Sequence, residues 1–133
     1  MRRAILILCF VLFGATGCVH SPGPADLASA DYGPKPENYE ETIKNVFTSK
    51  LRDPSSAQWN FGAPYQGYAI ASPIQGGYVQ GYGWFLDVGL NAKNGFGGYT
   101  GFQNYRLFYS HGSWHGPCLQ HMGGFSCSGV SDS

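Results

Sequence analysis

Five side chains that could bind a metal ion or form a disulfide bond lie between positions 111 and 127. They are His111, His115, Cys118, His121 and Cys127. Histidine nitrogens and cysteine thiolates are common zinc ligands, but the spacing lacks the paired C-x-x-C pattern of strong zinc sites. Gly112, Gly116 and Pro117 also oppose a helix that would bring His111 and His115 together. On spacing alone, a metal site, a disulfide between Cys118 and Cys127, and free thiols all remain open.

Acidic residues that could catalyse hydrolysis are scarce after position 52. Those beyond position 52 are Asp53, Asp87 and Asp132. Hydrolysis by paired carboxylates needs two poised acids, and a serine nucleophile needs an oriented base. No catalytic signature surrounds the neighbouring pairs Ser110–His111 and Ser113–His115. We therefore expect a protein that is not an enzyme and that needs no cofactor.

The composition excludes two further classes of protein. The 133 residues include eight basic and eight acidic side chains, so the formal net charge is zero. Nucleic-acid binding proteins need a concentrated basic face, so nucleic acid is not an expected partner. Disordered chains have few aromatic residues, whereas 16% of this chain is aromatic. The length fits a single domain.

The first 18 residues have the order of a bacterial export signal. Arg2 and Arg3 precede an apolar run over residues 4–13, which is too short to span a bilayer. The segment Ala15-Thr16-Gly17-Cys18 that follows resembles the lipobox of bacterial lipoproteins. This resemblance implies that residues 1–17 are a signal peptide and are removed. It also implies that Cys18 is linked to diacylglycerol and acylated, with palmitate among the acyl chains.

A lipid on Cys18 would hold the protein on a membrane of the cell envelope, because three acyl chains exceed what stable anchoring needs. Val19 stands where enteric-type sorting uses Asp to retain lipoproteins at the inner membrane. We therefore expect the outer membrane, with the domain in the periplasm rather than outside the cell. After residue 17 the chain has six basic against eight acidic residues, a net charge of −2, so it offers no basic patch for anionic lipid.

The remaining chain divides into a flexible tether over residues 18–36 and a single domain over residues 37–133. The tether is rich in Pro, Gly, Ala and Ser and lacks apolar periodicity. Residues 37–52 predict one amphipathic helix, with a capping box at Asn38 and Glu41 and an ion pair between Glu40 and Lys44. Its apolar stripe consists of Tyr39, Ile43, Val46, Phe47 and Leu51.

Short strands are predicted over residues 57–61, 65–70, 84–92 and 102–109. Alternation of period two is clearest in the last two strands, and Asn94-Gly95 between them predicts a hairpin. Residues 71–83 are expected to form a long loop and residues 110–133 to wrap the surface. The predicted fold class is α+β, with one N-terminal amphipathic helix packed on a small, mostly antiparallel sheet with glycine-rich loops.

Two sequence boxes flank the predicted strands: DPSSAQW at residues 53–59 and NAKNGFGGYTGF at residues 91–102. They resemble boxes in a scattered group of small exported bacterial proteins and lipoproteins of unknown activity, so the resemblance implies an architecture and no reaction. More loosely, small lipoproteins of this kind also serve as accessory pieces of secretion-machine cores. The second box is a candidate recognition loop, with Asn91, Lys93, Asn94, Phe96 and Tyr99 as its candidate residues. The alternative is that its asparagines and glycines only shape a demanding hairpin.

Export favours one of the alternatives for the C-terminal cysteines. Cys9 leaves with the signal peptide and Cys18 carries the lipid, which leaves Cys118 and Cys127 in an oxidising compartment. We expect these two to form a disulfide, with metal binding by the nearby histidines as the minor alternative.

Together these features predict a non-enzymatic outer-membrane lipoprotein that contributes an interaction surface to an envelope assembly. The alternative function is a glycan or peptidoglycan binding module that stacks sugars on exposed aromatic rings. The candidate rings are Tyr65, Tyr68, Tyr78, Tyr82, Trp84 and Tyr99.

Overall fold

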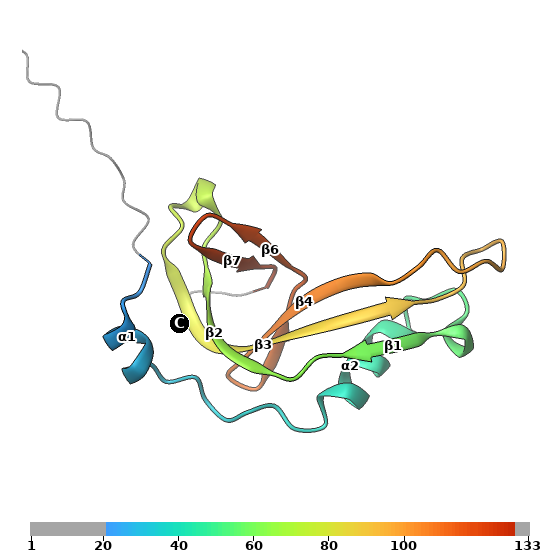
Figure 1. The fold of residues 1–133 in the computed structure, drawn as a ribbon, viewed down its shortest axis with the longest axis horizontal. Coiled ribbons are helices and arrows are strands. Elements are labelled where there is room, and N and C mark those ends of the chain that lie inside the picture. Colours follow the sequence, from blue (N-terminus) through green and yellow to red (C-terminus); the bar gives the residue numbers. More distant parts are fainter. Residues whose placement is uncertain (1–20, 130–133) are drawn as a thin grey trace, which may run out of the picture.

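The computed structural model describes residues 21–129, which form two α-helices and seven β-strands (Figure 1). In chain order they are α1 (Pro24–Ser29), α2 (Tyr39–Thr48), β1 (Gln58–Phe61), β2 (Tyr65–Ile70), β3 (Val79–Asn91), β4 (Gln103–Ser110), β5 (Ser113–His115), β6 (Cys118–His121) and β7 (Gly124–Cys127). Two 3₁₀-helical turns, η1 (Pro54–Ser56) and η2 (Pro73–Gln75), precede β1 and β3. The strands join one mostly antiparallel sheet, which confirms the predicted α+β class. The prediction of a single helix is wrong, because α1 precedes α2.

The long strand β3 organises the sheet, whose order is β5-β4-β3-β2-β7-β6. β4 pairs with one edge of β3 in the register Phe85↔Phe108 and Leu86↔Leu107, which confirms the predicted hairpin. The other edge of β3 pairs first with β2 and then, nearer its end, with β1. β2 and β7 run parallel, whereas the other strand pairs are antiparallel.

One face of the sheet packs against α2. Ile43, the buried residue of α2, packs with Leu86, Val88 and Leu107 in a fully enclosed cluster. The partly buried residues Tyr39, Phe47, Trp59, Phe61 and Trp114 surround this cluster. Because side chains alternate along a strand, Leu86 and Val88 face α2 while Phe85 and Asp87 face the opposite side.

The opposite face carries a second cluster beneath the β6–β7 hairpin. Phe85 and Phe108 pack there with Ala69 and Cys127, and their ring centroids lie 4.9 Å apart. The hairpin lies over one end of the sheet, where β2, β3 and β4 run side by side (Figure 1). Toward the other end, where β1 pairs with β3, the residues on this face are polar, as described below.

Three segments differ from the sequence-based expectation. The predicted tether contains α1, and the ring of Tyr32 packs edge-on against Tyr82 at 5.7 Å. The predicted loop over residues 71–83 ends early, because β3 begins at Val79. The C-terminal segment forms β5, β6 and β7 instead of an irregular wrap.

Helix α2 is shorter than predicted, and its start differs from the predicted capping box. Asn38 adopts a left-handed conformation, with φ of 50°, and its side chain makes no capping hydrogen bond. The expected ion pair between Lys44 and Glu40 is present at 3.7 Å. No helix within residues 21–129 is long and apolar enough to cross a membrane. The predicted signal peptide and Cys18 lie outside the described residues.

Candidate functional site

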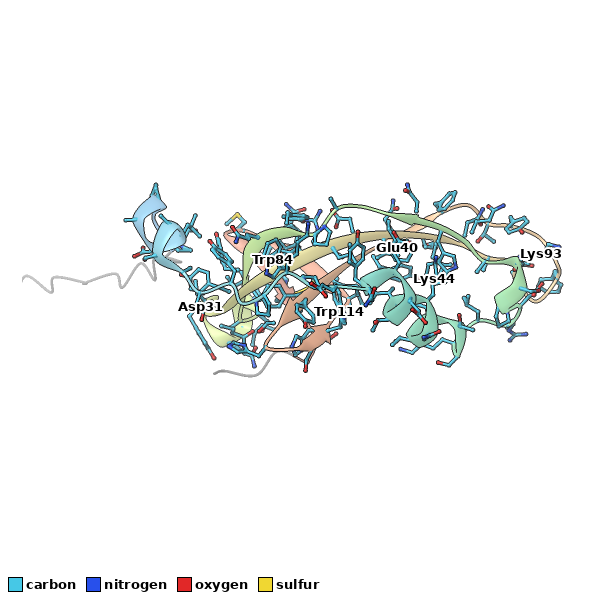
Figure 2. The ribbon with its side chains drawn as sticks, turned by 90° about the horizontal axis from the view of Figure 1, so that it is seen from below. Asp31, Glu40, Lys44, Trp84, Lys93 and Trp114 are labelled. Atoms are coloured by element: carbon cyan, nitrogen blue, oxygen red, sulfur yellow. A yellow bond between two sulfur atoms is a disulfide. The ribbon has the colours of Figure 1, made fainter. Side chains whose placement is uncertain are left out.

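The loop that joins β3 to β4, residues 92–102, forms one end of the molecule, and we call it the distal loop. Figure 2 shows Lys93 at this end and Asp31, just after α1, near the other. The distal loop contains most of the second sequence box, and the first box lies beside it through η1 and β1.

A turn built around Asn94 shapes the distal loop. The side-chain Oδ1 of Asn94 accepts hydrogen bonds from the backbone N–H groups of Phe96 at 2.9 Å and Gly98 at 3.1 Å. The backbone of Asn94 also bonds to Gly97 and Gly98. Gly97 has a φ of 80°, a conformation that most side chains avoid. Asn94 Oδ1 therefore holds the turn together.

Ser56 joins the two sequence boxes. Its Oγ accepts a hydrogen bond from the backbone N–H of Lys93 at 2.9 Å, and its carbonyl oxygen accepts one from the Tyr99 hydroxyl at 3.0 Å. The same Oγ donates to the carbonyl oxygen of Asp53 at 2.8 Å. The two boxes begin at residues 53 and 91, which are 38 positions apart, and these hydrogen bonds join them into one structural unit.

The outer surface of the distal loop is aromatic and basic. Phe96 is 100% exposed, and Tyr99 and Phe102 are about half exposed. The Lys93 ammonium lies over the Tyr99 ring, 5.7 Å from its centroid. An exposed aromatic side chain on a turn fixed by hydrogen bonds can dock into a pocket of a partner.

Asn91 does not belong to this surface. It is the last residue of β3 and is buried, with its Nδ2 donating to Gln58 Oε1 at 3.1 Å. Its Oδ1 is buried without a hydrogen-bond partner. Asn91 was predicted as one of the recognition residues, but β3 continues to this position and the side chain is buried, so it is not part of the exposed surface of the distal loop.

The C-terminal cysteines are joined to each other. Cys118 and Cys127 form a disulfide across β6 and β7, with Cα atoms 4.0 Å apart, which confirms the predicted pairing. His121 Nε2 lies 2.7 Å from Ser126 Oγ, and His111 Nδ1 lies 2.8 Å from Ser110 Oγ. Within residues 21–129, no three histidine, cysteine or acidic side chains gather closely enough to hold a metal ion.

Asp87 forms an ion pair that the sequence analysis missed. Arg106, its partner across β3 and β4, donates from Nε to Oδ1 at 2.6 Å and from Nη2 to Oδ2 at 2.8 Å. This hydrogen bonding raises the pKa of Arg106, against the lowering effect of burial. Burial raises the pKa of Tyr65 nearby, and Asp87 raises it further, while Arg106 acts in the opposite direction.

The aromatic rings proposed for sugar stacking do not form one platform. Tyr99 lies on the distal loop, whereas Tyr68 packs against Tyr82 at an angle of 60°. Trp84 Nε1 donates to the carbonyl oxygen of Gly33, so this ring is engaged by the segment after α1. Of the six rings, Tyr65, Tyr78 and Tyr99 are among the exposed residues.

Comparison with known proteins identifies no relative of this chain. No protein family model, no curated protein and no solved structure matches it.

Proposed function

We propose that this chain is a non-enzymatic lipoprotein of the bacterial outer membrane and that its distal loop binds a protein of an envelope assembly. The exposure of Phe96 is the observation that carries the proposal. The export signal and the lipobox ending at Cys18 support the anchor. The two sequence boxes resemble those of small envelope lipoproteins, which supports a role in the envelope. We include the core of a secretion machine among the assemblies that this protein could join.

Exposing the apolar side chain of Phe96 to water is unfavourable in free energy. Burying such a side chain in a partner contributes about 1.5–3 kcal/mol from its apolar surface. The hydrogen bonds from Phe96 and Gly98 to Asn94 fix the turn before binding, so less conformational entropy is lost on docking. The Lys93–Tyr99 pair adds a cationic rim beside the apolar anchor.

The position of the distal loop agrees with a lipid anchor at Cys18. The described chain begins beside α1, and the distal loop lies at the opposite end of the molecule (Figure 1). A domain attached to a membrane through its N-terminal segment would carry the distal loop on the end away from that attachment. Helix α2 lies against one sheet face, and Phe96 in the distal loop remains fully exposed.

The first test is the mass of the protein extracted from envelopes in detergent. We expect a chain that begins at Cys18, carries three acyl chains and lacks two hydrogens at Cys118 and Cys127. A mass without acyl chains would contradict the anchor.

The second test is co-purification of envelope proteins with matched variants. We expect Phe96→Ala to lose the partner and Ile74→Ala to keep it. Ile74 is a suitable control because it is 99% exposed but lies on η2, outside the distal loop. Equal retention by both variants would contradict a role for the distal loop.

A further inference from the structure

A second surface of the molecule is a cleft on the sheet face opposite α2, which we call the polar cleft. Its volume is about 530 Å³, within the range of small-molecule binding sites. Strands β1, β3 and β4 form its floor, and residues of β6 and β7 form its wall. The residues used in the argument below are Asn60, Asp87, Gly89, Asn104, Arg106 and Phe125.

Two amide side chains converge over a glycine on the floor of the polar cleft. Asn60 and Asn104 are the cross-strand neighbours of Gly89 in β1 and β4. A Cβ atom on Gly89 would lie 3.2 Å from Phe102 Cδ1, 3.3 Å from Asn60 Cβ and 3.4 Å from Asn104 Oδ1. The missing side chain of Gly89 therefore makes room for the Phe102 ring and for both asparagines. Neither amide hydrogen-bonds to another group in the described part of the chain.

The next row of the floor is the ion pair of Asp87 and Arg106. Its two hydrogen bonds fix both side chains in one plane, and their charges cancel. The Arg106 guanidinium also lies over the Phe125 ring at 4.4 Å and near the Tyr65 ring at 5.7 Å. The polar cleft thus contains fixed planar donors and acceptors, no net charge, and one aromatic ring, Phe125, at its side.

These properties select among ligand classes. A charged ligand would have to break the Asp87–Arg106 pair or remain uncompensated. An apolar ligand would displace water from Asn60 and Asn104 without replacing its hydrogen bonds, which costs about 1–3 kcal/mol for each amide that becomes buried. A neutral ligand with many hydroxyl groups matches both the donors and the acceptors, and its C–H groups can pack beside Phe125.

We propose that the polar cleft binds a neutral saccharide. The site differs from the set of aromatic rings considered from the sequence, because its specificity comes from Asn60, Asn104, Asp87 and Arg106. It also lies apart from Phe96, so binding of a saccharide and docking of a protein partner can be tested independently.

The experiment is a titration of the full chain with N,N′,N″-triacetylchitotriose and maltotriose, both neutral, followed by NMR. The protein is kept in a detergent without a sugar headgroup, and tetraalanine is the peptide probe. We expect saturable shifts of the Asn60 and Asn104 side-chain amide signals and of the Gly89 backbone amide signal with at least one saccharide. Each lost hydrogen bond weakens binding about fivefold, so Asn60→Ala/Asn104→Ala should bind about 25-fold more weakly.

Gln103→Ala is the matched control, because Gln103 precedes Asn104 in β4 and points to the other sheet face. It should bind like the unaltered protein. The single variant Asn104→Ala, at an exposed position, covers the case in which the double variant does not fold. The proposal is overturned if neither saccharide causes saturable shifts, if tetraalanine alone does, or if saccharide affinity is unchanged in the asparagine variants.

Discussion

Replacing Ser56 with alanine should loosen the distal loop from the body of the protein. The change removes the Ser56 Oγ hydrogen bonds to the Lys93 N–H at 2.9 Å and to the Asp53 carbonyl at 2.8 Å. A net contribution of about 0.5–1.5 kcal/mol per bond gives about 1–3 kcal/mol for the pair. Lys93 is exposed, so water replaces part of the loss, and we expect a decrease of about 1–2 kcal/mol in the free energy of unfolding.

Urea denaturation measures this change, and amide hydrogen exchange at Lys93 localises it. The neighbouring variant Ser55→Ala is the control, because Ser55 is exposed and its Oγ donates to the side chain of Asp53, a residue only two positions away. We expect Ser55→Ala to change the free energy of unfolding by less than about 0.5 kcal/mol. If Ser56→Ala costs no more than Ser55→Ala and leaves Lys93 exchange unchanged, Ser56 does not join the two boxes.

Three further changes test the fold and its charges. Ile43→Ala, in the buried contact between α2 and the sheet, should lower the free energy of unfolding by about 2–5 kcal/mol, and calorimetry should show a matching fall in Tm. Joint replacement of Cys118 and Cys127 by alanine should cost about 2–3 kcal/mol in urea denaturation, because the short loop they close is freed in the unfolded chain. The raised pKa of Tyr65 means that the folded state holds this proton more tightly than the unfolded chain, so stability should fall as pH rises past about 10. Tyr65→Phe should lose less stability between pH 9 and 11, and equal losses would contradict the shift.

The centre of the fold was predictable because its signal is local. Period-two alternation over residues 84–92 and 102–109, with Asn94-Gly95 between them, predicts the β3–β4 hairpin that the structure contains. The face of each residue follows from the same alternation, so Leu86 and Leu107 lie on one side and Phe85 and Phe108 on the other.

The edges of the fold were not predictable because tertiary contacts determine them. Val79 begins β3 where the sequence is rich in glycine, since β2 supplies the pairing partner at Ile70. Strands β6 and β7 are four residues each, too short for a clear period, and are joined by the disulfide.

In the candidate site, too, the local features were predictable from the sequence and the tertiary contacts were not. The turn at Asn94 follows from the sequence, but the contact of Ser56 with Lys93 depends on how β1 pairs with β3. Asp87 and Arg106 could have been paired from the sequence, because aligning the two strands of the hairpin places them opposite each other. The polar cleft could not, because the β6–β7 hairpin that forms its wall had no sequence signal.

Photo-crosslinking in intact cells tests the central claim most directly. A photoreactive amino acid at position 96 should crosslink the full-length protein to one envelope protein, whereas the same group at position 74 should not. The two positions are both fully exposed, so a difference reports recognition and not accessibility alone. The absence of a specific product at position 96, or the same product at both positions, would contradict a partner-binding role for the distal loop.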